Sequence, residues 1–213
     1  MELAGVTAEQ TGMQPVTGKS LTGYFAQDKQ GIVFPERDYV LVGKERHDVG
    51  RPNDEGYPIR GIFKNDYLYL RNFEPDRWPK GNPETGYLNC DGSPTKTYIL
   101  DSRRKKGNME YWQMNFGKRP EEELYHIGND PFCMHNIADD DSYTALKEEL
   151  ENELLKKLNE EGDPRALGNG EIFDNYPYNG AVKDYYNRHM SGEKIPAGWV
   201  NPTDYDEYLK DES

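Results

Sequence analysis

The feature that most constrains the fold is one long amphipathic segment, D-D-S-Y-T-A-L-K-E-E-L-E-N-E-L-L-K-K-L-N-E-E-G-D-P, at 140–164. Its apolar side chains recur at intervals of three and then four residues, at Tyr143, Leu146, Leu150, Leu154 and Leu158. This spacing predicts a helix with one apolar face. Asp141 or Ser142 can cap its start, and Gly162 and Pro164 mark its end. Because such a face must be buried, the rest of the chain has to supply a surface for it.

Four segments with the residue pattern of β-strands can form that surface. The segment 38–44, D-Y-V-L-V-G-K, and the segment 123–127, E-L-Y-H-I, are rich in β-branched, aromatic and aliphatic residues. Segments 59–64 and 67–73 are separated only by Asn65-Asp66, which predicts a tight hairpin. We therefore expect an α+β fold: a small antiparallel sheet of about four strands covered by the long helix.

Long irregular segments are expected elsewhere, because the chain has 21 glycines and 14 prolines in 213 residues and only 34% hydrophobic residues. Residues 74–110 read as irregular, and 111–117 as a short helix or an extended segment. The chain divides into a linker region at 1–36, a core subdomain at 37–165 and an extended tail at 166–213. Within the tail, 203–210 is compatible with a last helical turn.

The net charge and the number and spacing of the cysteines limit which ligands and partners this chain can bind. A formal net charge of −13 argues against nucleic acid as a partner. The two cysteines, Cys90 and Cys133, form no metal or redox motif, and whether they pair stays open. No apolar run approaches the length of a membrane span, and the first ten residues do not have the pattern of a signal peptide. They read as the end of a short helix capped by Gly5.

The densest polar constellation is Glu45-Arg46-His47-Asp48, which directly follows a predicted strand. Arg46 is suited to an anionic group and His47 to hydrogen bonding or proton transfer, so together they are a candidate polar anchor. The alternative is an exposed turn with weak local ion pairs. Arg60 is a third candidate, on a predicted strand beside Ile59 and Gly61-Ile62. It can face a cleft or the solvated side of the sheet, and the residues alone favour the solvated side. The basic run 103–106 reads as a solvated loop unless it folds over a cleft.

Catalytic and metal motifs are missing from the sequence. It contains no G-x-S-x-G, P-loop, G-x-G-x-x-G or H-E-x-x-H pattern. The histidines show no metal-ligand spacing, and the acidic run 139–141 fits a helix start better than a calcium loop. The residues by themselves lead to a small α+β domain with long loops and no assigned chemistry.

Five motifs in order resemble the C-terminal portion of the sulfatase family. K-R-P-E-E-E-L-Y-H-I-G-N-D-P-F-C-M-H-N-I-A at 118–138 is similar to its closing signature, with His126 where aspartate is usual. It is followed by the amphipathic helix and by G-D-P-R at 162–165. M-E-L-A-G-V at 1–6, T-G-K-S-L at 17–21, and the segments 42–48 and 57–73 also fit the family order. The segment 74–110 and G-N-G-E-I-F-D-N-Y-P-Y at 168–178 resemble the heparan N-sulfatase (sulfamidase) or arylsulfatase-like branch.

The resemblance implies a subdomain that lines the active-site cleft, with Arg46, His47 and Arg60 as substrate-binding residues. It also implies what this chain lacks. The family's C-x-P-S-R or S-x-P-S-R motif, which yields the formylglycine nucleophile, and its calcium-binding Asp-Asp and Asp-Asn pairs have no counterpart in this sequence. No catalytic residue and no metal ligand is therefore expected in this chain, which we expect to be inactive alone.

By the same resemblance, the whole enzyme would be periplasmic or secreted and would hydrolyse sulfuric esters or sulfamates of a sulfated carbohydrate or an aryl sulfate. The partner of this chain would be the catalytic domain, and self-association is expected where that domain would otherwise pack. The alternatives are a free-standing module that binds sulfated glycans and an interaction domain without a ligand.

Overall fold

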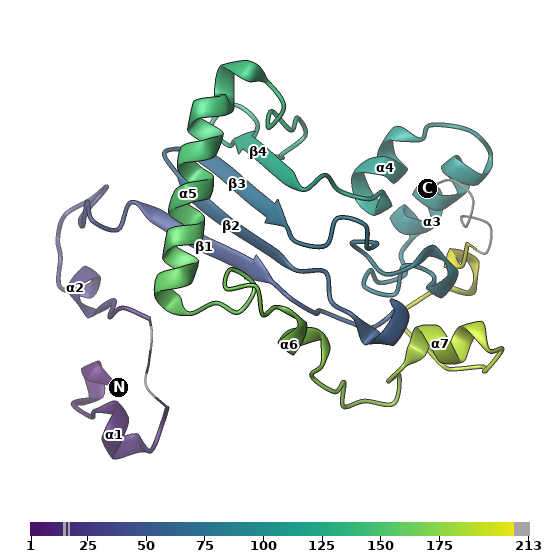
Figure 1. Ribbon diagram of the computed structural model, residues 1–213, viewed down its shortest axis with the longest axis horizontal. Helices are drawn as coiled ribbons and strands as arrows, with labels where there is room; N and C mark the ends of the chain where they lie inside the picture. Colours follow the sequence, from purple (N-terminus) through teal and green to yellow (C-terminus); the bar gives the residue numbers. More distant parts are fainter. Residues whose placement is uncertain (15, 17, 207–213) are drawn as a thin grey trace. The chain divides into compact units, whose positions relative to one another are not determined.

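A computed structural model describes residues 1–14, 16 and 18–206 and shows an α+β arrangement (Figure 1). Four strands form one sheet in the order β1-β2-β3-β4: β1 Tyr39–Lys44, β2 Ile59–Lys64, β3 Tyr67–Asn72 and β4 Glu122–His126. The long helix α5, Thr144–Glu161, lies across this sheet and packs on β2 and β3. The predicted fold class is confirmed.

The predicted hairpin joins β2 and β3, which pair antiparallel from Ile59 opposite Asn72 to Lys64 opposite Tyr67. Asn65 and Asp66 form its turn with φ angles of 50° and 64°. Two positive φ angles are what a two-residue hairpin turn requires, and asparagine and aspartate tolerate them better than most residues. The local sequence therefore determines both the turn and the strand register.

The leucine stripe of α5 is buried against the sheet. Leu150, Leu154 and Leu158 are 2%, 0% and 4% exposed. The helix ends where predicted, at Gly162 with a φ of 73°, but it begins later, at Thr144. A short 3-10 turn, η4 (Asp141–Tyr143), precedes it, and the side chain of Asp140 caps that turn by accepting a hydrogen bond from the Ser142 amide.

Ion pairs along the edges of the stripe fix α5 on the sheet. Three salt bridges join strand residues to helix residues, with nitrogen–oxygen distances of 2.8, 2.8 and 2.9 Å: Lys64–Glu153, Arg71–Glu151 and Glu122–Lys147. All six side chains are only partly exposed. Such pairs add modest stability, but they oppose any sliding of the helix along the sheet.

Residues 74–110 are more regular than expected, and 111–117 adopt the helical alternative of the two that were predicted. They contain the 3-10 turn η3 (Pro83–Thr85) and two helices, α3 (Pro94–Arg104) and α4 (Glu110–Phe116). Ser93 caps α3 by accepting a hydrogen bond from the Lys96 amide, and Pro94 occupies the first turn. The prediction of a solvated basic loop at 103–106 is only partly right. Arg103 and Arg104 form the last turn of α3, where cations interact favourably with the helix dipole, whereas Lys105 and Lys106 lie in an exposed turn.

Two apolar clusters hold this region and the C-terminal part together. One unites α3 and α4: Tyr87, Ile99, Leu100, Trp112 and Phe116. The other joins the 49–88 region to the C-terminal part: Val49, Leu88, Val182, Tyr185, Ala197 and Val200. The C-terminal part contains α6 (Glu171–Asp174), α7 (Tyr185–Met190) and the 3-10 turn η5 (Pro202–Asp204). Residues 207–210 of the predicted last turn lie outside the described residues.

The chain divides into two compact units, Met1–Val40 and a second that begins at Leu41. The first contains η1 (Glu2–Ala4), α1 (Ala8–Thr11) and α2 (Thr22–Phe25). Gly5 caps η1 in the left-handed conformation, as predicted, although the turn is 3-10. In the second unit, η2 (Pro52–Asp54) lies between β1 and β2.

The pairing of the cysteines, which the sequence left open, has a structural answer. Cys90 and Cys133 are both free thiols, so no disulfide joins them. Over residues 1–14, 16 and 18–206, no helix is long and apolar enough to cross a membrane.

Leu154→Ala should lower the free energy of unfolding by about 2–5 kcal/mol, because a fully buried leucine leaves a cavity between helix and sheet. The measurement is urea denaturation followed by circular dichroism. Lys156→Ala on the exposed side of α5 is the matched control, with a change within about 0.5 kcal/mol. Equal destabilisation by both substitutions would contradict the packing described.

Candidate functional site

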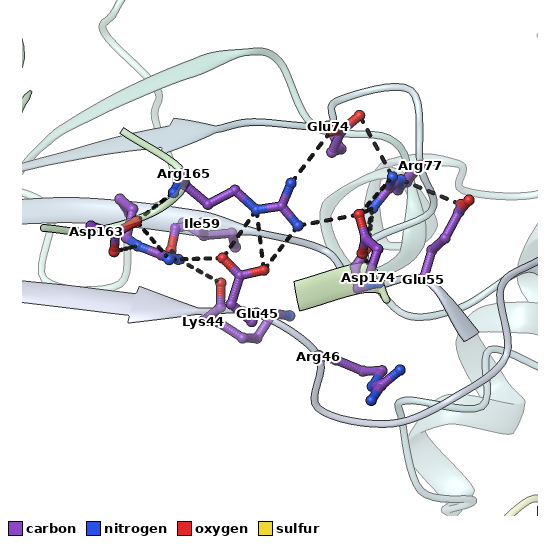
Figure 2. Close-up of polar contacts among 12 residues, drawn as sticks. Lys44, Glu45, Arg46, Glu55, Ile59, Glu74, Arg77, Asp163, Arg165 and Asp174 are labelled. Atoms are coloured by element: carbon purple, nitrogen blue, oxygen red, sulfur yellow. Dashed lines mark hydrogen bonds and ion pairs between the residues drawn. The ribbon is translucent and has the colours of Figure 1, made fainter. Parts of the chain in front are cut away.

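Charged side chains converge where β1 and β2 meet the end of α5 and the helix α6 (Figure 2). We call this set the charged network: Glu45, Arg60, Arg77, Asp163, Arg165 and Asp174. The six come from five separate segments of the chain, and all belong to the second unit. In space, acids and bases alternate in the order Asp163, Arg60, Glu45, Arg165, Asp174 and Arg77, and each forms an ion pair with the next.

Arg60 lies at one end of the charged network. Its Nε donates to Asp163 at 2.7 Å, and its Nη2 donates to Glu45 at 2.7 Å and to Asp163 at 3.2 Å. Its Nη1 donates to the backbone oxygens of Lys44 and Ile59. The side chain is 8% exposed. All three guanidinium nitrogens thus have acceptors within the protein.

Arg165 lies at the centre of the charged network. It contacts Glu45 at 3.1 Å, Asp174 at 3.3 Å and Glu74 at 3.7 Å, and its side chain is only 5% exposed. The two carboxylates of Glu45 and Asp174 are thereby held on either side of one guanidinium (Figure 2). Removing that cation would leave two partly buried carboxylates without their shared partner.

Arg77 closes the other end of the network. It binds Asp174 at 3.2 Å and Glu55 at 3.5 Å, and it donates to the backbone oxygen of Gly56. Asp174 also accepts a hydrogen bond from the Gly56 amide at 3.1 Å. The loop between β1 and β2 is therefore bound to the loop after β3 and to α6.

The acids of the network ionise readily despite partial burial. Burial opposes ionisation of Asp163, but the hydrogen bond and the charge of Arg60 outweigh it, so the pKa of Asp163 lies below its ordinary value of 3.8. Burial likewise opposes ionisation of Asp174, yet the Gly56 amide, Arg77 and Arg165 lower its pKa. Both carboxylates are charged at neutral pH, as the pairing requires.

The predicted site residues separate into two groups. Arg46 is half-buried and donates to the backbone oxygens of Asp54 at 3.1 Å and Tyr176 at 2.8 Å, with its guanidinium 5.7 Å from the ring centre of Tyr178. His47 is exposed. Arg60 belongs to the charged network instead. The structure thus places Arg46 and His47 directly after Glu45, whose carboxylate anchors the start of their loop.

Sequence reasoning missed most of the charged network. Glu45 was noticed only as part of a polar cluster, and Asp163 and Arg165 only as a G-D-P-R family mark. Arg77 and Asp174 lay within segments noted only for their family resemblance, and their pairing could not be predicted because they are 97 positions apart in the chain. Within the described residues, no group of three or more histidine, cysteine, aspartate or glutamate side chains is placed to hold a metal ion.

Chemically, this arrangement positions a loop. The network has no nucleophile, and its guanidinium groups are neutralised by carboxylates. Its effect is to fix the start of the 45–48 loop against β2 and α6, so that Arg46 and His47 have a defined position.

Comparison with known proteins shows a relationship to sulfatases. The chain is 32% identical over 163 residues to an ulvan-active sulfatase of Formosa agariphila, over 72% of this chain and 29% of that protein. It is 30% identical over 143 residues to a second ulvan-active sulfatase of the same organism, over 65% of this chain and 22% of that protein. No protein-family model matches the chain. The chain spans less than a third of the length of either relative.

Arg165→Met should lower the free energy of unfolding by about 1–3 kcal/mol, because Glu45 and Asp174 lose their shared buried partner but each keeps one arginine, Arg60 and Arg77 respectively. Chemical denaturation at neutral pH measures the change. Arg188→Met removes an exposed pair with Glu193 and should cost less than about 1 kcal/mol. Similar values for the two variants would show that the network adds no more than a surface pair does.

Acid should weaken the fold through Asp163 and Asp174. Their folded-state pKa values are lowered, so the unfolded chain takes up protons first as the pH falls. Their contribution is present above the ordinary pKa of 3.8 and is lost as the pH falls below it. Unfolding free energies measured between about pH 5 and 2 should show this loss, with a smaller slope for Asp163→Asn. An unchanged slope in that variant would show that Asp163 does not contribute to the loss of stability in acid.

Proposed function

We propose that this chain is the C-terminal subdomain of a sulfatase, a hydrolase of sulfuric esters or sulfamates. In this proposal it forms one wall of the substrate pocket and supplies Arg46 and His47 as substrate contacts. The observation that carries the proposal is the sequence similarity to part of two sulfatases over about two thirds or more of the chain. The order of the family motifs along the sequence agrees with it.

The chemistry would be supplied by the rest of the enzyme. Sulfate-ester cleavage needs a nucleophile and a metal ion that polarises the sulfate oxygens. By resemblance to the family, these are a formylglycine residue and calcium, and this sequence contains neither the nucleophile motif nor the calcium-binding pairs. The chain alone is therefore expected to be inactive.

Arg46 and His47 suit the role of substrate contacts for different reasons. The guanidinium of Arg46 is held by two carbonyl oxygens and no carboxylate among the residues described, so its charge is available to an anion. His47 is exposed and can donate a hydrogen bond. Arg60 is bound by Asp163 and Glu45, which favours a supporting role for it over direct substrate contact.

The sheet face opposite α5 supports the presence of a further packing partner. Val42 on β1 is 41% exposed, and Phe63, Leu68 and Leu70 on β2 and β3 are only half-buried. An apolar sheet surface of this kind favours contact with more protein. We assign it to the catalytic domain of the enzyme, with self-association as the outcome in its absence.

The substrate class follows from the same proposal. A sulfated carbohydrate fits an enzyme whose relatives are named ulvan-active sulfatases. The finer assignment to the heparan N-sulfatase (sulfamidase) or arylsulfatase-like branch, with a glycosaminoglycan substrate and a periplasmic or secreted enzyme, rests on motif resemblance alone.

The test compares this chain with the complete protein encoded at its locus. The complete protein should contain a C-x-P-S-R or S-x-P-S-R motif upstream of Met1 and hydrolyse 4-nitrophenyl sulfate or a sulfated sugar, whereas the chain alone should not. His47→Ala in the complete protein should lower kcat/KM roughly 10- to 100-fold, since it removes one directed substrate contact. Arg188→Met is the surface control and should leave kcat/KM unchanged.

Two results would contradict the proposal. Turnover by the isolated chain would show that it carries its own chemistry. A coding sequence without the nucleophile motif would exclude a formylglycine sulfatase.

A further inference from the structure

A second group of cations, separate from the charged network, gathers around Arg51. Arg51 is 1% exposed, and its guanidinium donates to the backbone oxygens of Trp78 at 2.6 Å, Pro79 at 3.0 Å and Glu55 at 3.2 Å. These acceptors are neutral. The nearby carboxylates of Glu55 and Asp174 instead form ion pairs with Arg77. Arg51 is thus a buried cation hydrogen-bonded to carbonyl groups.

Lys44 lies close to Arg51 across the ring of Tyr57. The Lys44 ammonium is 5.6 Å from the Tyr57 ring centre, and the Arg51 guanidinium is 5.8 Å from the same centre. Lys44 is half-buried at the end of β1. Over the described part of the chain, no ion pair joins Lys44 or Arg51 to a carboxylate. Two cations therefore share one aromatic ring without a direct counterion.

Two further lysines extend this group. Lys80 is exposed and directly follows Pro79, which accepts a hydrogen bond from Arg51. The ammonium of Lys118 is 5.6 Å from the ring centre of Trp78, whose backbone oxygen also accepts from Arg51. Neither lysine is ion-paired within residues 1–14, 16 and 18–206. We call Lys44, Arg51, Lys80 and Lys118 the basic cluster.

Burial and neighbouring positive charges disfavour the protonated forms of Lys44 and Arg51. Burial, together with the charges of Lys80 and Arg51, lowers the pKa of Lys44 to about 8. Burial lowers the pKa of Arg51 to about 10, with Arg77 adding to the effect, although Tyr57, Glu55 and Asp174 oppose it. A bound anion would reverse both effects, because an opposite charge favours the protonated form.

The basic cluster contrasts with the rest of the chain. The protein carries a net charge of −13, so four cations without carboxylate partners are a local reversal of its charge. The basic run at 103–106 is different, because Arg104 is paired with Asp206 and Asp101, and Arg103 stacks on Trp112. Besides Arg46, the basic cluster is therefore a second place among the described residues where positive charge lacks a carboxylate partner.

We propose that Lys44, Lys80 and Lys118 bind a sulfate ester group of a sugar, with Arg51 behind them as a fixed positive charge. Lysine ammonium groups bind oxyanions as point charges. Trp78 is half-buried: its ring packs on the apolar cluster of α3 and α4 and has the Lys118 ammonium 5.6 Å from its centre, so the part of the ring left exposed beside Lys118 is the surface proposed for a sugar ring. The choice of sulfate over other anions rests on the proposed function, but the cluster itself does not.

The experiment measures binding to the 213-residue chain by NMR of its ¹³C-labelled lysine side chains. Sodium sulfate is compared with sodium chloride at equal ionic strength, and N-acetylglucosamine 6-sulfate with unsulfated N-acetylglucosamine. Sulfate and the sulfated sugar should raise the pKa of Lys44 above about 8, whereas chloride and the unsulfated sugar should not. Binding should weaken as the pH rises through that value, because Lys44 then loses its charge.

Variants locate the site. Lys80→Met and Lys118→Met should each weaken binding of the sulfated sugar roughly fivefold, since each removes one nearby charge. Lys156→Met is the matched control, because Lys156 is 71% exposed on α5, and it should leave binding unchanged. Thermal unfolding of each variant confirms that it is folded.

Each remaining outcome overturns the inference in whole or in part. Equal effects of sulfate and chloride would show that the cluster responds only to ionic strength and has no specific anion site. Equal weakening by Lys156→Met would exclude a defined site, and equal affinity for free sulfate and the sulfated sugar would exclude the contact with a sugar ring. If this chain binds sulfate but the complete protein has no sulfatase activity, the anion site stands and the proposed function is wrong. If the complete protein is active but this chain does not bind sulfate, the proposed function stands and the anion site is wrong.

Discussion

The arrangement of the second unit depends on two buried guanidinium groups, Arg60 and Arg165, held between the carboxylates of Glu45, Asp163 and Asp174. Each charge would be costly alone in this environment, so each is tolerated only while its partners stay in place. Because the partners come from β2, α6 and the segments that directly follow β1 and α5, the network defines how these parts of the chain meet. The loop of Arg46 and His47 begins at this junction and takes its position from it.

The charged network and the basic cluster show two uses of the same residue types. In the network every arginine has carboxylate partners, which makes it a structural device. In the basic cluster Arg51 bonds only to carbonyl oxygens, and the neighbouring lysines have no carboxylate partners among the residues described. The arginines paired with carboxylates support the fold, whereas the cations without carboxylate partners are suited to bind an anion. This distinction makes a substrate-contacting subdomain of a sulfatase a coherent proposal for so acidic a chain.

The elements that were predicted well are those whose signal is local. The β2–β3 hairpin followed from two strands around Asn65-Asp66, and α5 followed from its leucine spacing and from Gly162. The start of α5 was misplaced because the acidic segment before it forms a separate 3-10 turn capped by Asp140, and α5 itself begins after Tyr143 without a side-chain cap. Helix α3 was missed because its apolar residues are few, so its formation depends on the cap at Ser93 and on packing against Trp112 and Phe116.

The sequence by itself determined the α+β class, the hairpin and its register, the covering helix, and the resemblance to sulfatases, because these depend on periodicity, turn chemistry and motif order. The tertiary structure alone decided which charges meet. Arg60 and Asp163 are 103 positions apart, and Lys44, Arg51, Lys80 and Lys118 are spread over three segments of the chain. Whether an arginine or lysine supports the fold or is available to a ligand depends on the charges that folding brings near it, and spacing along the chain does not contain that information.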